Sequence, residues 1–236
     1  MTQDPTPAAV VIVFAIFDEV TQLDFTGPWE VLTRLPHAQV VVASREGGEV
    51  RAQNGLTFSR VDRLDRIPAC DLLCMPGGPG TSAAMLDEAY LAEVRRLAEG
   101  ARFVTSVCTG SLILGAAGLL AGRRATSHWS SLDLLTDFGA QPVRERVVRD
   151  GRVITGGGVT AGIDFALTVA AELAGDEHAQ LIQLGLEYAP APPFDAGDPW
   201  TAPEPRRRAY RAMAERWLAE RRRAVDLALD RMKQGA

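Results

Sequence analysis

Continuous apolar, β-branched runs alternate along the chain with segments whose apolar residues recur at helical spacing. The first kind of run predicts buried strands and the second predicts helices. Two short runs on either side of Asp150-Gly151 predict an antiparallel hairpin, and the pairs Gly47-Gly48 and Asn54-Gly55 mark a second, polar hairpin region. Strands are predicted at 10–17, 39–44, 71–75, 102–107, 146–149 and 152–155, and helices at 25–35, 89–99, 160–174 and 176–187. Buried strands alternating with helices predict an α/β protein with a mostly parallel sheet covered on both faces.

The last forty residues differ from this pattern. Residues 189–205 are rich in proline and predict an extended segment without regular structure. A long helix is predicted from Arg206, with ten Arg and Lys against four acids. Its apolar residues fall near one face: Ala209, Met213, Trp217, Ala224, Ala228 and Met232. We therefore expect an α/β domain at 1–193, followed at 194–236 by a proline-rich segment and an amphipathic helix packed on the same domain or on a second subunit.

Composition narrows the class of protein. The chain has 236 residues, 47% of them apolar, and a net charge of −5, which gives no general attraction to nucleic acid. The apolar run at 8–17 is too short to span a bilayer and has no basic residues before it, so neither a membrane partner nor a signal peptide is expected. Three cysteines without a framework spacing favour a reducing cytoplasm. Cys70 and Cys74 lack the further ligands of a zinc site, and Cys74 is expected in the core.

One cysteine stands where a predicted strand turns directly into a helix. The run 103–107 ends at Cys108, and the small residues of 109–111 lead into a helical pattern. Such a corner exposes the side chain at a helix N-terminus, whose dipole favours a thiolate and a lowered pKa. The alternative is a small core residue ending a buried strand. We predict a nucleophile elbow at Cys108 in a flavodoxin-like three-layer sandwich.

Two other segments can meet Cys108, because the carboxyl ends of parallel strands share one edge of a sheet. Asp24 follows the first strand and could act as an acid or base, although an Asp before a helix is often only an N-cap. Gly77-Gly78 follows the third strand, and the Gly78 N–H could bind a developing anion. The segment lacks the Lys-Ser/Thr of a phosphate loop. The Thr109 N–H could donate to the same anion.

With these motifs in place, the chain resembles the ThiJ/PfpI superfamily, which has the class I glutamine amidotransferase-like fold. The resemblance covers about 10–193. It is carried by 22–28, 76–78, 104–111, 114–120, 124–129, 145–151, 155–158, 161–165 and 186–193. Asp24, Thr109 and the sequence Glu187-Tyr188-Ala189-Pro190 together are most similar to the branch that hydrates isonitriles. The protease-like members instead carry His after the nucleophile, where this chain has Thr109.

The resemblance implies hydration of a small isonitrile to an N-substituted formamide. Cys108 would be the nucleophile that forms a thioimidate, and Asp24, with its pKa raised by burial and by the thiolate, would be the general acid and base. Thr109 and Gly78 would hold the intermediate. His128 and Gly157 are expected to line the pocket; a dyad role for His128 would need an H-x-E order that is missing. No metal or organic cofactor is implied, and members of the superfamily commonly form homodimers.

The alternative to an enzyme is a ligand sensor or a redox or stress-response protein. AraC-type regulators carry a sensor domain of this superfamily with a similar Ser-His-Trp sequence, which is 127–129 here. A regulator would need about a hundred more residues for DNA binding. A thiol of low pKa at Cys108 could instead be oxidised to a sulfinate.

Overall fold

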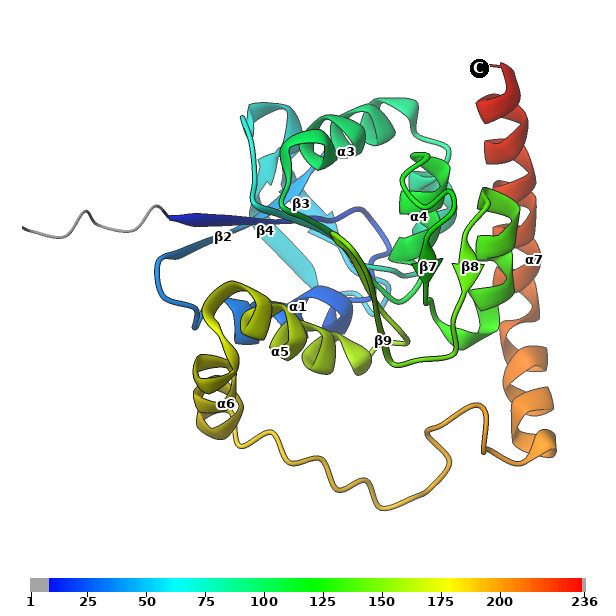
Figure 1. Ribbon diagram of the computed structural model, residues 1–236. Coiled ribbons are helices and arrows are strands. Elements are labelled where there is room, and N and C mark those ends of the chain that lie inside the picture. Colours follow the sequence, from blue (N-terminus) through cyan, green and yellow to red (C-terminus); the bar gives the residue numbers. More distant parts are fainter. Residues whose placement is uncertain (1–8, 235–236) are drawn as a thin grey trace, which may run out of the picture.

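A mostly parallel, eight-stranded sheet runs through the centre of the computed structural model, which describes residues 9–234 (Figure 1). The strand order is β3-β4-β2-β1-β5-β6-β10-β9. Only β3 and β9 run antiparallel to their neighbours. The strands are β1 Val10–Ala15, β2 Ala38–Ser44, β3 Gly48–Arg51, β4 Thr57–Arg63, β5 Leu72–Met75, β6 Phe103–Val107, β9 Val147–Asp150 and β10 Val153–Gly156. A separate two-stranded sheet pairs β7 Arg124–Ala125 with β8 Gln141–Pro142.

Helices cover both faces of the sheet, as Figure 1 shows. Successive strand residues point to opposite faces, so Leu73 packs with one helical layer while its neighbour Leu72 packs with the other. One layer contains α3 and α4, and the other contains α1 and α5, with α6 packed on α5. The helices are α1 Leu23–Leu32, η1 Leu64–Arg66, α2 Thr81–Ala84, α3 Glu88–Gly100, α4 Gly110–Ala116, η2 Trp129–Phe138, α5 Ala161–Ala174, α6 Asp176–Gly185 and α7 Glu204–Gln234. The predicted α/β sandwich is confirmed.

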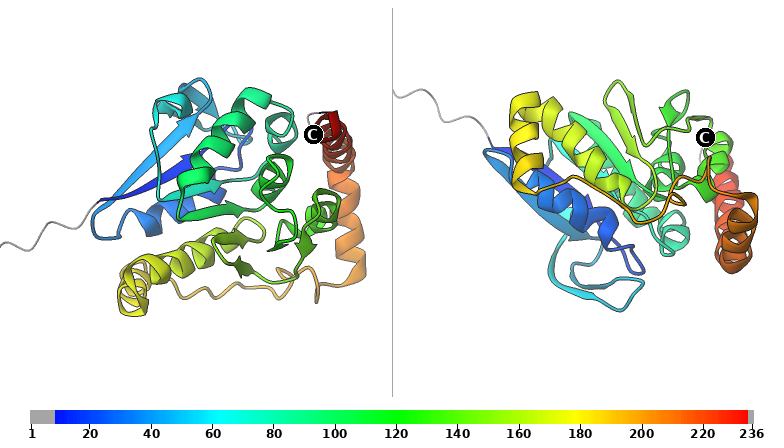
Figure 2. Two further views of the ribbon diagram at one scale, coloured as in Figure 1. Left: turned by 45° about the horizontal axis from the view of Figure 1, so that its top comes forward. Right: turned by 90° about the horizontal axis from the view of Figure 1, so that it is seen from below.

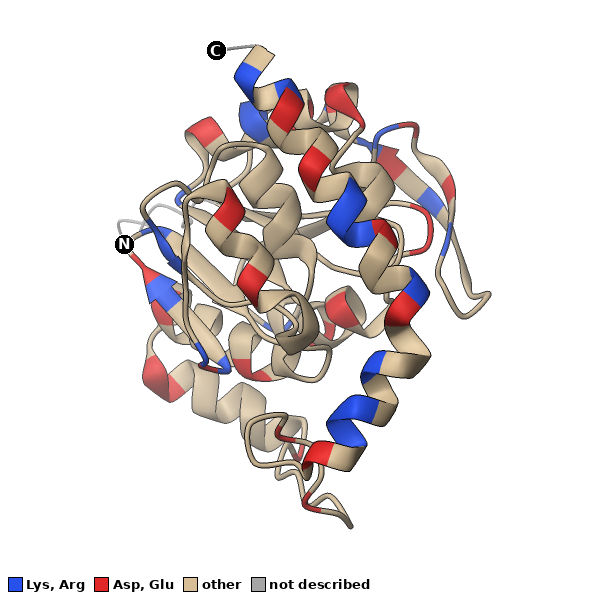
Figure 3. Ribbon diagram, turned by 90° about the vertical axis from the view of Figure 1, so that its right-hand side faces the viewer, with Lys and Arg blue, Asp and Glu red and all other residues tan. Residues whose placement is uncertain are grey.

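The chain beyond α6 crosses the molecule before it ends in α7. Residues 189–203 contain no helix or strand and run along the underside of the body to the start of α7 (Figure 2). The helix then packs against η2, α2 and α4. Ala224, Val225 and Ala228 are buried in this contact, whereas Met213 is 81% exposed and Trp217 54% exposed. The predicted apolar stripe thus meets the domain only along the second half of the helix. Most charged residues of α7 are exposed, and Figure 3 shows them distributed along the helix.

Local sequence patterns located most elements but shifted some boundaries. The six predicted strands correspond to β1, β2, β5, β6, β9 and β10, and the hairpin across Asp150-Gly151 is confirmed. The first helix begins at Leu23, two residues before its expected start, which places Asp24 inside its first turn. The short elements α2, β7 and β8 had no distinct sequence signal. Within residues 9–234 no helix has the length and apolar character needed to cross a membrane.

The sheet topology gathers four loops at one edge. Strands β1, β5, β6 and β10 are parallel neighbours, so the segments that follow them emerge together. The first turn of α4 then lies directly against the end of β5. A Cβ at Gly110 would overlap the carbonyl oxygen of Met75, so only glycine allows this approach.

Replacement of Gly110 by alanine tests this close contact. We expect Gly110→Ala to lower the free energy of unfolding by about 3 kcal/mol, because the backbone of β5 must move to make room. Gly185→Ala, at the end of α6, is the matched control, since its Cβ would meet nothing within 4 Å. The control should be neutral or stabilising by about 0.5 kcal/mol. Equal midpoints for the two variants in urea unfolding would contradict the packing described here.

Candidate active site

The backbone at Cys108 makes a sharp corner between β6 and α4. Its φ angle is +58°, in the left-handed region that a residue with a side chain rarely adopts. Four bonds hold the corner. The Cys108 N–H donates to the carbonyls of Gly156 (3.1 Å) and Gly157 (2.9 Å), and its own carbonyl accepts from Ser111 Oγ (3.2 Å) and Ser127 Oγ (3.1 Å). The surrounding structure therefore fixes the cysteine on a strand-to-helix elbow.

A cavity of about 440 Å³ opens beside this elbow. Its floor contains Cys108 and Thr109, and its walls come from segments far apart in sequence. The lining residues are Glu19, Thr21, Gln53, Asn54, Gly78, Pro79, His128, Ser130, Val159, Tyr210, Ala214, Trp217, Leu218 and Arg221. Five of them belong to α7, so this helix closes one side of the cavity.

Asp24 is fully buried beneath the cysteine. Its Oδ2 accepts a hydrogen bond from the Gly77 N–H at 2.9 Å, and its Oδ1 has no partner of ordinary geometry among residues 9–234. Burial raises the pKa of Asp24 from 3.8 to about 7, although the Gly77 N–H and an interaction with the Cys108 thiol both lower it. Burial thus gives the expected rise in the Asp24 pKa, but the expectation that the thiol raises it further is wrong, because the interaction with Cys108 lowers it. Asp24 is no helix cap, because Gln22 occupies the N-cap position of α1.

The thiol behaves differently from the expectation based on its helix terminus. Cys108 is only 5% exposed, and burial raises its pKa well above 9, with the nearby Asp24 carboxylate raising it further. The Thr109 N–H and the Arg221 guanidinium act in the opposite direction but do not overcome burial. The prediction of a lowered pKa is therefore wrong, because desolvation outweighs the favourable helix terminus.

Thr109 links the elbow to the loop after β5. Its Oγ1 accepts from the Gly78 N–H at 3.0 Å and lies 2.9 Å from Thr81 Oγ1. The Gly78 N–H, predicted to face the intermediate, thus already has a partner in this structure. The Thr109 N–H points to the Cys108 sulfur and lowers its pKa, so it is the backbone donor placed for a developing anion.

The two predicted pocket residues occupy different positions. His128 lines the cavity and precedes η2, where its Nδ1 lies 2.8 Å from Ser130 Oγ. Burial, together with the Arg221 charge, lowers the His128 pKa to about 4, so the imidazole is neutral. Gly157 is not among the residues lining the cavity with Cys108; its carbonyl holds the Cys108 N–H, and it lines a neighbouring cavity.

Sequence reasoning missed the contribution of α7 to the site. Tyr210, Trp217 and Arg221 all reach the cavity, although this helix was expected only to pack its apolar stripe on the domain or on a second subunit. A signal was present: Arg221 shares the helical spacing of Trp217, Ala224 and Ala228, and therefore lies on the apolar stripe. An arginine within such a stripe indicates a buried guanidinium.

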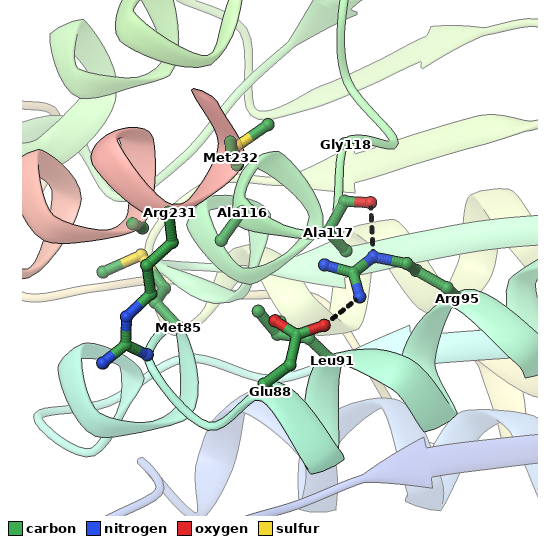
Figure 4. A pocket seen from close by; sticks show the side chains of 10 residues that line it. Met85, Glu88, Leu91, Arg95, Ala116, Ala117, Gly118, Arg231 and Met232 are labelled. Atoms are coloured by element: carbon green, nitrogen blue, oxygen red, sulfur yellow. Dashed lines mark hydrogen bonds and ion pairs between the residues drawn. The ribbon is translucent and has the colours of Figure 1, made fainter. Parts of the chain in front are cut away.

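A second cavity of about 400 Å³ lies between α3, α4 and the end of α7 (Figure 4). Its side chains include Met85, Leu91 and Met232. Its Arg95 guanidinium is bonded to Glu88 and to the Ala117 carbonyl. Its lining contains no Cys, Ser, Thr or His, so the chemistry belongs to the cavity at Cys108. The described part of the chain contains no group of three His, Cys, Asp or Glu placed to hold a metal ion.

A cysteine on a strand-to-helix elbow at the carboxyl edge of a flavodoxin-like sheet, with a buried acid beside it, defines the class of this protein. The chain belongs to the DJ-1/PfpI family, whose sequence model matches residues 10–172, so the predicted family is confirmed. It is similar to a ThiJ/PfpI family protein from Pseudomonas syringae of known crystal structure, with a TM-score of 0.89 and 39% identity. That match covers 97% of this chain and 94% of the other.

Two curated relatives bear on function. The isonitrile hydratase of Pseudomonas putida is 51% identical over 226 residues, which cover 94% of this chain and 99% of that enzyme. An HTH-type transcriptional regulator of Pseudomonas aeruginosa is 34% identical over 138 residues, and these cover 41% of the regulator and 58% of this chain. Similarity to the hydratase therefore extends over nearly the whole chain, whereas similarity to the regulator covers a smaller part of it.

The raised pKa of Asp24 predicts a pH-dependent stability. Between about pH 4 and 7 the folded protein keeps a proton that the unfolded chain has released, so the free energy of unfolding falls as the pH rises. The loss reaches about 4 kcal/mol above pH 7. Asp24→Asn cannot ionise, so its stability relative to the wild type should increase between pH 4 and 8.

Urea unfolding at a series of pH values measures this difference. Asp133→Asn, at an exposed position of η2, is the control and should run parallel to the wild type. A constant difference between Asp24→Asn and the wild type across the range would show that Asp24 has an ordinary pKa.

Proposed function

We propose that this protein hydrates isonitriles, R–N≡C, to N-substituted formamides. The observation that carries the proposal is the buried pair of Asp24 and Cys108, in which a carboxyl of pKa about 7 interacts with a thiol at a constrained elbow. Similarity to the Pseudomonas putida enzyme along nearly the whole chain supports the same substrate class. The pair supplies the two things that the reaction needs, a nucleophile and a proton donor.

The first half of the reaction forms a thioimidate. Above pH 7 the pair holds one proton, which can lie on either group across their interaction. With the proton on Asp24, the Cys108 thiolate attacks the terminal carbon of the isonitrile while Asp24 protonates the same carbon. The product is R–N=CH–S–Cys108, and Asp24 is left as the carboxylate. The Thr109 N–H stabilises the sulfur as its charge changes.

The second half adds water. The Asp24 carboxylate accepts a proton from water as its oxygen attacks the thioimidate carbon, and the imine nitrogen gains that proton through Asp24. The tetrahedral R–NH–CH(OH)–S–Cys108 then collapses. The C–S bond breaks, the hydroxyl proton passes to Asp24, and the formamide R–NH–CHO leaves. Asp24 carries a proton and Cys108 is again the thiolate, so the pair is ready for another turnover.

The cavity suits a small, neutral substrate. Val159, Trp217 and Leu218 provide apolar wall for the R group above the sulfur. The neutral state of His128 removes a competing acid from the cavity lining. Burial of the site limits access of bulk water to the thioimidate, which favours a single positioned water.

The alternative functions fit the site less well. Oxidative sensing needs only a reactive cysteine, and it gives the buried Asp24 carboxyl beside Cys108 no role as a proton donor. A ligand sensor needs a cavity but has no use for a proton donor beside a nucleophile. A buried carboxyl that lacks a partner for one oxygen is costly for the fold, and catalysis accounts for that cost.

Three substitutions test the mechanism in one assay. Cys108→Ala removes the nucleophile, so formamide production should fall to background. Asp24→Asn keeps the shape and the bond from Gly77 but cannot cycle a proton, so kcat should fall by about two orders of magnitude or more. Thr109→Ala keeps the backbone N–H and should cost less. Formamide is measured with cyclohexyl isonitrile, and the thioimidate is trapped by acid quench and found as a mass increase on Cys108.

Cys70→Ala, at a buried cysteine far from the cavity lining, is the matched control and should retain activity. Wild-type turnover by Cys108→Ala, or no turnover of any isonitrile by the wild type, would reject the hydratase. A ligand sensor would then be the better explanation.

The free state of all three cysteines suits a reducing compartment, and we propose a cytoplasmic enzyme.

We further propose that the enzyme is a homodimer in which a second copy covers the first half of α7. This half presents Tyr210, Met213 and Trp217 to solvent, with Met213 81% exposed. An apolar surface of this kind on a helix indicates a contact with another protein surface. A second copy of the chain would bring an equivalent surface.

Light scattering at micromolar concentration tests the dimer. We expect twice the chain mass for the wild type and the monomer mass for Met213→Asp, whose charge cannot be buried without a partner. Leu184→Asp changes an equally exposed residue of α6 and is the control. A monomeric wild type would reject the dimer, and dissociation by Leu184→Asp alone would move the contact to α6.

A further inference from the structure

Arg221 is a buried cation in the wall of the active site. It lies on α7, is 8% exposed, and lines the same cavity as Cys108 and Thr109. Its Nη1 donates to Ser131 Oγ at 3.0 Å and its Nη2 to the Gly78 carbonyl at 3.4 Å. Its Nε has no partner, and no carboxylate forms a salt bridge with it, among residues 9–234. A guanidinium keeps its proton even when buried, so this site contains a positive charge without a fixed counter-ion.

The other titratable groups around the cavity do not balance this charge. Glu19 lies in an exposed part of the rim, and Glu220 lies on the exposed side of α7. Tyr210 has a raised pKa and stays neutral, as does His128. The remaining groups are Cys108, in the floor of the cavity, and Asp24, which is buried beneath it. When they share one proton, they carry a net charge of −1.

We propose that Arg221 is the counter-ion of the Asp24–Cys108 pair, a positioning residue that stabilises its one-proton, thiolate-forming state in a buried site. Because the guanidinium and the sulfur share one low-dielectric cavity, their attraction is screened little. The positive charge of Arg221 favours loss of the second proton from the pair. The attraction is strongest in the tautomer that places the negative charge of the pair on the sulfur. The lowering of the Cys108 pKa by Arg221 agrees with this arrangement.

The inference gives α7 a part in the chemistry. This helix lies outside residues 10–172, the part of the chain that matches the family model. Its second half is anchored on the domain by buried Ala224, Val225 and Ala228, and by the bond from Arg231 Nη1 to the Leu86 carbonyl at 2.5 Å. Arg221 lies about one helical turn before Ala224 and Val225, so these contacts hold it against the site. The helix thus places a cation beside the elbow, whereas the loops that line the cavity contain no Arg or Lys.

The test measures thiol reactivity and needs no isonitrile. Although the role in turnover rests on the proposed function, the charge effect does not. The rate of alkylation of Cys108 by neutral iodoacetamide is followed from pH 5 to 10 by mass spectrometry of the Cys108 peptide. Arg221→Gln retains hydrogen-bond donors but loses the charge, so we expect alkylation at pH 7.5 to slow roughly tenfold, with the profile moved to higher pH. Arg221→Lys restores the charge and should return to within about threefold of the wild type.

Arg222→Gln is the matched control. Arg222 adjoins Arg221 but forms its ion pairs with Asp137 and Asp226 away from the cavity, so its alkylation profile should equal that of the wild type. Circular dichroism establishes that each variant is folded. Arg221→Met supplies a second neutral side chain of similar length if the Gln variant does not fold.

Two alkylation results would overturn the inference. A folded neutral variant with the wild-type profile would show that the charge does not act on the thiol. A Lys variant as slow as the Gln variant would show that the shape of the guanidinium matters and its charge does not. Hydration of cyclohexyl isonitrile provides the second readout, with kcat lowered roughly tenfold and KM unchanged in Arg221→Gln. A change in KM alone would make Arg221 a substrate-binding group and reject its role as counter-ion.

Failure of the wild type to hydrate any isonitrile would reject the proposed function. The effect of Arg221 on alkylation would still be tested by the alkylation rates.

Discussion

A carboxyl group and a thiol are buried together at the end of the central sheet, and the rest of the site depends on how that burial is tolerated. Desolvation raises the pKa of both Asp24 and Cys108 and is the largest cause of each change. The Gly77 N–H offsets part of the effect for Asp24, and the Thr109 N–H and Arg221 offset part of it for the thiol. Each of these groups therefore changes where the shared proton of the pair lies.

Glycine makes this close approach between the two chain segments possible. A Cβ at Gly77 would come within 2.5 Å of the Thr109 N and Oγ1 and within 3.0 Å of Asp24 Oδ2. Any larger residue would therefore push the loop after β5 away from the elbow. The same loop supplies the Gly78 N–H to Thr109 Oγ1, so a single turn of backbone positions both the acid and the start of α4. The distance between acid and nucleophile is set by the backbone, which is stiffer than a pair of side chains would be.

Local patterns were sufficient to predict the sheet and the elbow. Apolar runs identified the strands, and the change from strand to helix at Cys108 needed only neighbouring residues. The prediction of a low pKa for the Cys108 thiol was wrong because the burial of this thiol depends on residues that are distant in sequence. The burial of Cys108 comes partly from α7, and the bond between Arg221 and the Gly78 carbonyl joins residues 143 positions apart. Contacts between residues so far apart in sequence depend on the path that residues 189–203 take across the molecule. The proline-rich composition of this segment predicts an extended path but not its direction.

The late position of α7 in the chain also has a consequence for biosynthesis. A chain emerges from the ribosome N-terminus first, so the sheet, the elbow and the buried acid can form before residue 221 has been synthesised. Closure of the long loop between the elbow and α7 then costs conformational entropy before any contact repays it. Until that final helix docks, the nascent enzyme carries an uncovered cysteine in a half-built cavity. A reducing environment or a chaperone would be needed most during this interval.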